Sequence, residues 1–204
     1  QAYNIVDGNY SSCEPNVCPF EYEYDYYNDS QCKVTKQAKY LKIVCWDKSE
    51  VTIGSASNLS LREMRLYSPS INKWNGSKAD AEIILKHKGG NGDTVSVCIP
   101  VEEGSSSDAG ADITFFDSVH EAIKVLNGER NGTMRAVELG GGFTLNNLIP
   151  RNKFYYADGD GIKFGTRACD ADTNKIVIFP LDKPIKLKPA VLTSLKALIS
   201  SVTV

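Results

Sequence analysis

Histidine is scarce in this sequence, which has only His87 and His120 among 204 residues. A catalytic zinc held by three imidazoles needs more histidines than the chain supplies. A nucleophilic triad needs a histidine between a serine and an acid, and neither histidine stands in a context that indicates one. We therefore expect neither kind of histidine-dependent site.

Long hydrophobic runs and a strong excess of either charge are also missing. No apolar stretch approaches the roughly 20 residues that cross a bilayer, so no membrane span is expected. The 23 basic and 25 acidic residues give a formal net charge of -2 at pH 7. This balance lacks the basic excess of nucleic-acid-binding chains. The length suits one domain with a sizeable core.

Cysteines are present in an even number, and three of the six fall within the first 32 residues. Their spacing matches no zinc-finger pattern, so they are better explained as disulfide partners than as metal ligands. Six cysteines can pair in many ways, and the sequence leaves the connectivity open. The disulfide candidates are Cys13, Cys18, Cys32, Cys45, Cys98 and Cys169.

Five N-glycosylation sequons accompany these cysteines, at Asn9, Asn28, Asn58, Asn75 and Asn131. Together the two features predict an oxidising compartment, and so a secreted or surface-exposed protein. The chain begins at Gln1 without a methionine, as would a mature chain after removal of a signal peptide, or a trimmed one.

Residues 1–37 differ from the rest, being rich in tyrosine, asparagine and cysteine. We expect them to form a segment that packs on, or extends from, a domain spanning 38–204. Acidic and aromatic residues alternate over 21–26, which predicts a strand with Tyr22, Tyr24 and Tyr26 on one face. That face either packs on the body of the domain or forms an exposed contact strip for a partner.

From residue 38 onward the pattern is that of short strands separated by turns, with a hairpin turn at 89–93 and a polar loop at 103–112. The predicted strands span 40–46, 50–53, 59–67, 81–87, 94–99, 137–139, 153–156 and 175–179.

Two helices are predicted. The first is marked by a capping box at Ser118 and Glu121 and stops at Asn127-Gly128. The second begins at Pro189 and carries a helical apolar stripe. The predicted fold class is a β-dominated α+β single domain with a large, mostly antiparallel central sheet and a few peripheral helices.

Several blocks of this sequence resemble segments of the α-carbonic anhydrase family, in the family's order. Arg62–Asn72 resembles the segment Gln-Phe-His-Phe-His-x-Pro-Ser-Glu-His, and Ala81–Lys88 resembles Glu-x-His-Leu-Val-His. Further matching stretches are 101–104 and 145–156. Ile-Val-Ile-Phe at 176–179 and Pro-Ile at 184–185 also match. The resemblance covers about residues 50 to 200 and implies the family's fold.

The resemblance places the family's three zinc-ligand positions at Arg65, Tyr67 and Ile84. Arginine stays charged and isoleucine has no donor atom, so we expect no metal and no cofactor. Ile71 stands where the family has the acid that orients a catalytic threonine. The stretch 164–169 retains one threonine and the cysteine of Leu-Thr-Thr-Pro-Pro-Cys. The chain is identified as a catalytically inactive, zinc-free member of the family and not as an enzyme.

The family also pairs a cysteine near the N-terminus with the one matched by Cys169. Cys13, Cys18 or Cys32 could supply that partner.

Cations gather where the resemblance places the zinc funnel. Strand alternation predicts that Arg65, Ile84 and Lys86 share one face, and the alignment adds Lys175. A concave site with Arg65, Lys86 and Lys175 would attract anions such as sulfated or acidic glycans. Alternatively, these side chains plug the funnel or pair with Glu63 and Glu82.

The expected function is a non-catalytic extracellular module for protein or glycan binding, or for assembly at a cell or virion surface. The family includes zinc-free members that act as adhesion or attachment domains, which the resemblance extends to this chain. One alternative is a structural subunit of a self-assembling extracellular polymer or capsid, whose partners are copies of itself. Another is an active hydratase or esterase with a rewired site.

Overall fold

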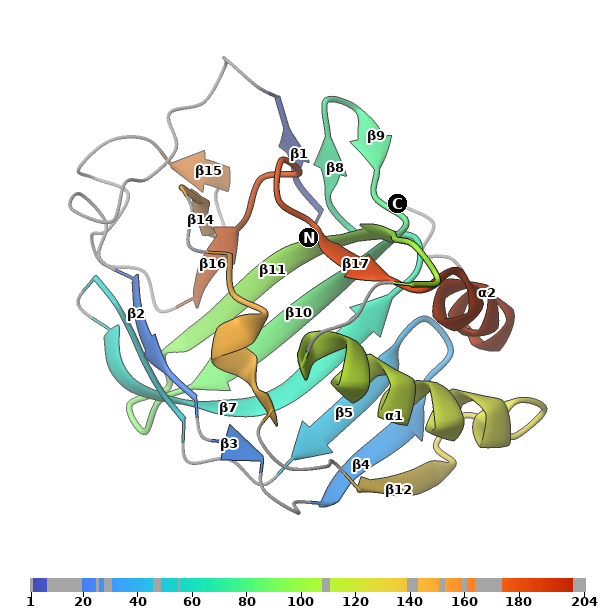
Figure 1. Cartoon of the computed structure of the whole chain (residues 1–204). Coiled ribbons are helices and arrows are strands. Elements are labelled where there is room, and N and C mark those ends of the chain that lie inside the picture. The colour runs from blue at the N-terminus through green and yellow to red at the C-terminus, as the bar shows by residue number, and fades with distance from the viewer. Residues whose placement is uncertain are drawn as a thin grey trace.

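Alternating apolar and polar side chains in the middle of the sequence form the long strands of one large sheet (Figure 1). These strands are β7 (Ala56–Tyr67), β10 (Ala81–Lys88) and β11 (Thr94–Glu103). The computed structural model describes residues 2–6, 20–24, 26–27, 31–45, 49–54, 56–107, 111–138, 143–150, 153–158, 161–163 and 174–199.

The central sheet has the strand order β12-β4-β5-β7-β10-β11-β16-β14-β15, with β17 beside β11 and β6 joining β2 to β7. Strands pair antiparallel throughout it, except that β11 runs parallel to both β16 and β17. The predicted β-dominated fold with a mostly antiparallel sheet is therefore confirmed. The remaining strands of this sheet are β2 (Phe20–Glu23), β4 (Gln31–Lys36), β5 (Leu41–Cys45), β6 (Glu50–Ile53), β12 (Met134–Glu138), β14 (Tyr155–Asp158), β15 (Gly161–Lys163), β16 (Asn174–Ile178) and β17 (Ile185–Leu187).

Two small sheets flank the large one. In the first, β1 (Asn4–Ile5) pairs parallel with β8 (Lys73–Trp74), which forms a hairpin with β9 (Ser77–Lys78). In the second, β3 (Tyr26–Tyr27) pairs with β13 (Phe143–Thr144), and the short 3-10 helix η1 (Leu145–Asn147) follows.

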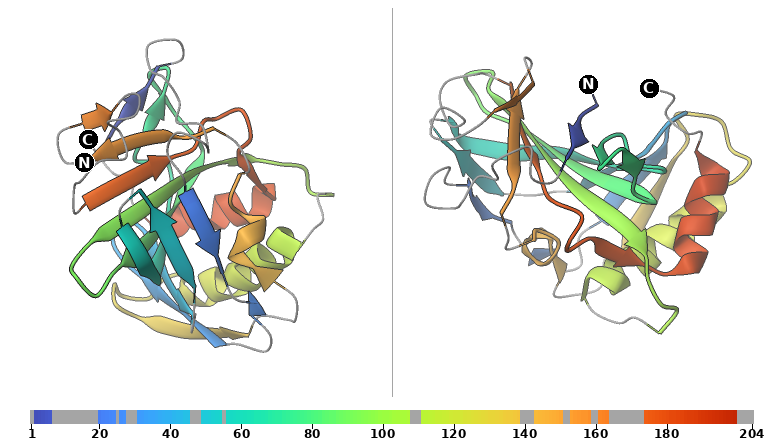
Figure 2. Two further views of the ribbon diagram at one scale, coloured as in Figure 1. Left: turned by 90° about the vertical axis from the view of Figure 1, so that its left-hand side faces the viewer. Right: turned by 90° about the horizontal axis from the view of Figure 1, so that it is seen from above.

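Helices α1 (Ala111–Leu126) and α2 (Pro189–Leu198) lie side by side on one face of the sheet (Figures 1 and 2). Their apolar faces close the main core. The stripe predicted for the second helix is confirmed, since Val191, Leu192, Leu195, Leu198 and Ile199 are all buried. A second, smaller core lies on the other face of the sheet and includes Tyr67, Ile84 and Cys98.

The predicted start of the first helix is wrong. Ser118 and Glu121 lie inside α1, which begins at Ala111, so they form no capping box. His120 accordingly lies within the helix, where its Nε2 is 2.9 Å from the Ser194 hydroxyl of α2. The predicted stop at Asn127-Gly128 is correct, because α1 ends at Leu126 and Gly128 adopts a φ of 82° that favours glycine.

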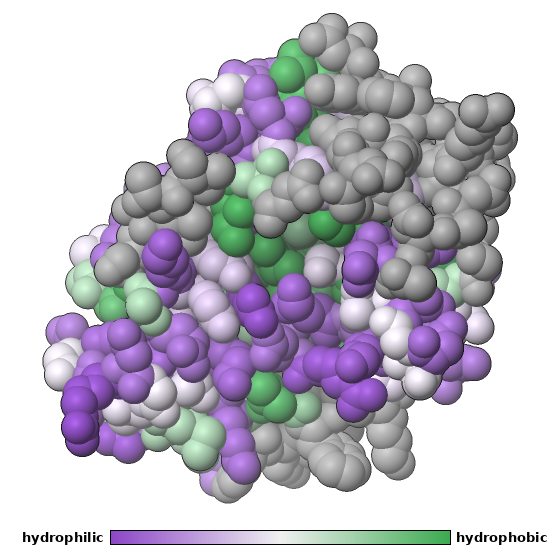
Figure 3. Space-filling model, turned by 180° about the vertical axis from the view of Figure 1, so that it is seen from behind, coloured by the Kyte–Doolittle hydropathy of each residue, from purple (hydrophilic) through white to green (hydrophobic). Residues whose placement is uncertain are grey.

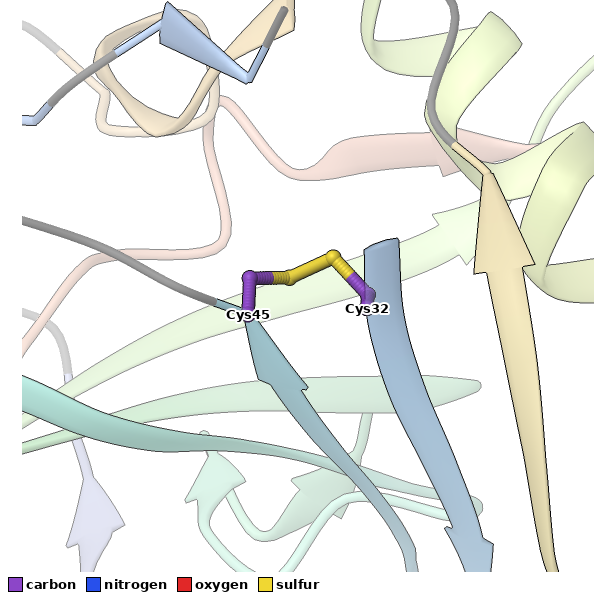
Figure 4. Close-up of a disulfide and its surroundings, with 2 residues drawn as sticks. All are labelled: Cys32 and Cys45. Carbon is purple, nitrogen blue, oxygen red and sulfur yellow. A yellow bond between two sulfur atoms is a disulfide. The ribbon is translucent and has the colours of Figure 1, made fainter. Parts of the chain in front are cut away.

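One disulfide joins Cys32 of β4 to Cys45 of β5, which face each other directly in the antiparallel pair (Figure 4). Cys32 is therefore not the partner of Cys169, which was one of the expected alternatives. Cys98 is a free, buried cysteine and not a disulfide partner. Cys13, Cys18 and Cys169 lie outside the described residues.

Candidate functional site

Arg65, Tyr67 and Ile84, the positions that the resemblance assigns to zinc ligands, come together in space. In the sheet register, Ile84 of β10 lies between Arg65 of β7 and Cys98 of β11. Tyr67 and Lys86 lie two residues along their strands from Arg65 and Ile84, so all four side chains emerge on one face. The predicted shared face of Arg65, Ile84 and Lys86 thus agrees with the structure.

These side chains line a cavity of about 190 Å³ on the face opposite the helices. Figure 3 looks onto this face and shows a hollow with apolar surface at its base, beside a band of hydrophilic side chains. We call it the funnel cavity. Its lining residues are Tyr3, Arg65, Tyr67, Ile71, Asn72, Ile84, Lys86, Ser96, Cys98 and Ile176.

Arg65 is held on one side of the funnel cavity by three neighbours. Its guanidinium forms an ion pair with Glu63 and a hydrogen bond with the Tyr67 side chain. Its Cζ lies 4.6 Å from the centre of the Tyr40 ring, within the range of a cation–π contact. Burial raises the pKa of Tyr67, whose hydroxyl therefore keeps its proton. The expected pairing with a local acid holds for Arg65.

Lys86 differs from Arg65 in having no such partner. In the part of the chain that the structure describes, no acidic side chain lies within salt-bridge distance of its ammonium. Partial burial, and then the positive charge of Arg65, lower the pKa of Lys86. An anion in the cavity would offset both effects.

Below the cavity, Glu82 is fully buried and bonds to the loop after β7. Its Oε2 accepts from the backbone N–H groups of Ile71 and Asn72 at 2.8 and 3.0 Å, and its Oε1 accepts from Asn72 Nδ2 at 2.6 Å. Burial raises the pKa of Glu82 to about 7, although the Asn72 hydrogen bonds oppose this. Asn72 Oδ1 in turn accepts from the backbone N–H of Tyr3 at 2.9 Å, which fixes the N-terminal strand against the cavity. Glu82 is therefore not a partner of the funnel cations.

The residues present do not fit a catalytic zinc, which this fold would otherwise imply. Arg65 repels a cation, Ile84 offers no donor, and burial holds the pKa of the Cys98 thiol well above its usual range. Neither histidine reaches the cavity, because His87 lies on the other face of the sheet and His120 on α1. Among the described residues, no group of three or more His, Cys, Asp or Glu is arranged to hold a metal.

Lys175 does not belong to the funnel cavity, which corrects one sequence expectation. In the register of β11 and β16, Lys175 lies beside Val95 of the main core, whereas the next pair, Ser96 and Ile176, lines the cavity. Its side chain therefore points to the helix-covered face. It is only 2% exposed, and its Nζ has no hydrogen-bond partner among the described residues.

The three tyrosines proposed as a contact strip do not form an exposed row. Tyr24 is 1% exposed and part of the main core, and Tyr22 is half-buried and packs against it. Of the two interpretations, packing on the domain applies to these two residues. The side chain of Tyr26 lies outside the described residues.

The sequon asparagines that the structure describes are all exposed, namely Asn58, Asn75 and Asn131. Asn58 and Asn75 adopt positive φ angles of 55° and 49°, a conformation that asparagine tolerates better than most residues. Asn9, Asn28 and the stretch 164–169, with its single threonine, lie outside the described residues.

Sequence reasoning missed several residues around the site. Ser96 and Cys98 could have been found, because strand pairing sets them opposite Lys86 and Ile84 on the same face. A second cavity of about 200 Å³ adjoins the first, since Lys86 and Ser96 line both. It adds the exposed Arg62 and Lys88, so basic side chains continue from the funnel cavity to the surface.

No helix in the described part of the chain is both long and apolar enough to cross a bilayer. No protein-family profile and no curated protein matches the sequence. The fold, in contrast, has clear counterparts among solved structures.

A fungal α-carbonic anhydrase from Aspergillus oryzae is 15% identical with a TM-score of 0.74, over 98% of this chain and 77% of that one. The α-carbonic anhydrase of Photobacterium profundum is 16% identical with a TM-score of 0.69, over 98% and 81% of the two chains. Dioscorin complexed with ascorbate is 15% identical with a TM-score of 0.72, over 98% and 76%. The chain therefore has the α-carbonic-anhydrase fold.

Proposed function

We propose that this chain is a non-catalytic, secreted binding module that holds an anionic group of a protein or glycan partner in the funnel cavity. The observation that carries the proposal is the pair of cations, Arg65 and Lys86, that line one concave site. A guanidinium and an ammonium are the side chains that proteins use to bind carboxylate and sulfate groups.

Size and charge define the ligand further. A water occupies roughly 30 Å³, so the funnel cavity has room for a single sulfate or carboxylate group with some water, and not for a whole sugar chain. The rest of an acidic ligand would lie along the adjoining cavity, beside Arg62 and Lys88. The similarly folded dioscorin was solved with ascorbate, which supports the idea that this fold can accept a small organic acid.

Two features support secretion. Cys32 and Cys45 form a disulfide across neighbouring strands, which is typical of oxidising compartments. Each sequon asparagine in the described chain is exposed and so accessible to modification.

Binding to sulfated chondroitin fragments, measured by calorimetry, tests the anion site directly. We expect Lys86→Met to weaken binding about tenfold or more, which corresponds to about 1.4 kcal/mol. The matched control is Lys39→Met, which removes the same charge from an exposed position in the turn between β4 and β5. Equal binding by the wild type and the Lys86 variant, or no binding to any acidic probe, would contradict the proposal.

A separate measurement tests the absence of catalysis. The purified protein is incubated with zinc, dialysed, and assayed for bound metal and for carbon dioxide hydration and ester hydrolysis. We expect neither stoichiometric zinc nor turnover, because Arg65 and Ile84 occupy ligand positions. Zinc bound one to one together with turnover would overturn this part of the proposal and favour the rewired enzyme.

A further inference from the structure

Strand β12 forms one end of the central sheet. It pairs with β4 along one edge, and within the described residues no strand pairs with its other edge. Four of its five side chains are exposed, with only Val137 buried. An open edge of this kind presents unpaired backbone N–H and C=O groups, which can pair with a strand of another chain.

Apolar surface lies next to this edge. A groove of about 310 Å³ lies between β12 and α1, where apolar Ala122, Val125, Ala136 and Val137 line it together with Ser118, Glu121, Arg135 and Glu138. Val125 is 55% exposed and Met134 is 48% exposed, and they are the exposed large hydrophobic residues of the described chain. The basic residue of the strand, Arg135, lies 3.6 Å from Glu129 and so has its charge partly neutralised. The strand has no lysine or proline to protect its edge, and its charged residues are the paired Arg135 and the exposed Glu138 at its end.

The turn that leads into this edge carries a sequon. The Thr133 N–H donates to the Arg130 carbonyl at 3.1 Å, and the Gly132 N–H donates to the Lys36 carbonyl of β4 at 2.8 Å. Gly132 has a φ of 91°, which glycine adopts without strain. Asn131 is thus held, exposed, in a tight turn three residues before the first residue of β12, Met134.

We propose that Asn131 carries an N-linked glycan, and that this glycan covers the open edge of β12 and its apolar surroundings and prevents pairing with a second copy of the chain. The inference depends on the secreted location given in the proposed function, and not on anion binding. The glycan does at this edge what charged residues do elsewhere, because a branched, hydrated sugar chain blocks the approach of another strand.

The modification needs one co-reactant, an oligosaccharide carried on a lipid diphosphate in the secretory pathway. Nδ2 of Asn131 forms a bond to the anomeric carbon of the sugar while the bond from that carbon to the diphosphate oxygen breaks. The lipid diphosphate leaves with the electron pair, and the amide nitrogen loses one proton to solvent. No oxidant or reductant is involved.

The test uses the full chain secreted from a eukaryotic host. Mass spectrometry of peptides measures glycan occupancy at Asn131, and analytical ultracentrifugation measures the oligomeric state of the wild type and of Asn131→Gln. We expect Asn131 to be occupied, the wild type to be monomeric, and the variant to associate with increasing concentration. Removal of the glycans from folded wild-type protein by a glycosidase should have the same effect, which guards against a folding defect of the variant.

Two further variants make the test specific. Met134→Lys added to Asn131→Gln should restore the monomer, since it places a charge on the edge. Ser77→Ala removes the sequon of Asn75 on the β8–β9 hairpin, at the opposite end of the molecule from β12, and should change nothing (Figure 1). An unmodified Asn131, or a monomeric Asn131→Gln protein, would overturn the inference, whatever the result of the chondroitin assay.

Discussion

The hydroxyl of Tyr24 lies 2.7 Å from Nε2 of His87, in the main core beneath the central sheet. The other ring nitrogen, Nδ1, lies 3.2 Å from the carbonyl oxygen of Val95, which can only accept. Nδ1 therefore carries the proton and Nε2 accepts from Tyr24. This pair links the tyrosine-rich segment before β3 to the middle of the sheet.

Loss of this hydrogen bond should weaken the fold. Tyr24→Phe leaves Nε2 of His87 without its donor in a buried site, so we expect the free energy of unfolding to fall by about 1 to 3 kcal/mol. Urea denaturation measures the change. Tyr22→Phe is the control, because Tyr22 is half-buried and its hydroxyl makes no hydrogen bond to a residue that the structure describes. Equal stability of both variants and the wild type would show that the pair contributes little.

His87 should make the protein sensitive to acid. Burial lowers the pKa of His87 to about 4, below the ordinary value of 6.5, so the folded state binds fewer protons than the unfolded state between these values. Stability from this group is complete above about pH 6.5 and is lost as the pH falls towards 4, by about 3 kcal/mol in total. Urea denaturation at several pH values should show that His87→Gln lacks this loss relative to the wild type. If the difference in the free energy of unfolding between the two proteins is the same at every pH, the lowered pKa of His87 is contradicted.

Glu82 should change the stability with pH in the opposite direction from His87, over nearly the same pH range. Its pKa of about 7 lies above the ordinary 4.5, so the folded state binds more protons and stability falls as the pH rises from about 4.5 to 7. The pH-dependent contributions of His87 and Glu82 to the free energy of unfolding therefore nearly cancel in the wild type. We expect Glu82→Gln to gain stability relative to the wild type as the pH rises, by up to about 3 kcal/mol. If the difference in the free energy of unfolding between the two proteins does not vary with pH, Glu82 is ionised in the folded protein over this whole pH range.

Replacement of Lys175 should stabilise the protein. Its buried Nζ has no hydrogen-bond partner in the part of the chain that the structure describes, and a buried polar group without one opposes folding. We expect Lys175→Met to raise the free energy of unfolding by about 1 to 3 kcal/mol. Lys186→Met is the control, since Lys186 forms only an exposed ion pair with Glu102 and its loss should change stability by less than about 1 kcal/mol. A destabilised Lys175 variant would instead point to a ligand or partner for that amine.

The disulfide between Cys32 and Cys45 closes a short loop, with a sequence separation of 13. Loss of the loop constraint on the unfolded chain corresponds to about 3 kcal/mol. We expect the double variant Cys32→Ala/Cys45→Ala to lose about 3 kcal/mol of unfolding free energy and to unfold at a lower urea concentration. An unchanged midpoint would mean that pairing of β4 with β5 and β12 suffices without the bond.

Sequence patterns predicted much of the fold because the central strands β7, β10 and β11 are long. The hairpin of β10 and β11 follows from alternation and a glycine-rich turn. The start of α1 was missed because the Ser-x-x-Glu motif at Ser118 is a local signal that also occurs inside helices. The buried spacing of Phe115, Phe116, Val119 and Ala122 is the signal that would have extended the helix backwards.

Strand alternation predicted the part of the site that depends on which face of a strand a residue occupies. Alternation correctly grouped Arg65, Ile84 and Lys86, but the face of Lys175 depends on its register with β11, which no local pattern specifies. The contact of Tyr24 with His87 joins residues 63 positions apart and left no signal in either segment. Burial of a polar pair of this kind follows from tertiary packing alone.

Tyr3 forms part of the wall of the funnel cavity, and the two-residue strand β1 that follows it pairs with β8. The wall of the site is thus formed in part by the segment nearest the first residue of the described chain. A fluorophore placed near Ala2 would sense ligands arriving there, whereas a bulky fusion at the same end would obstruct them.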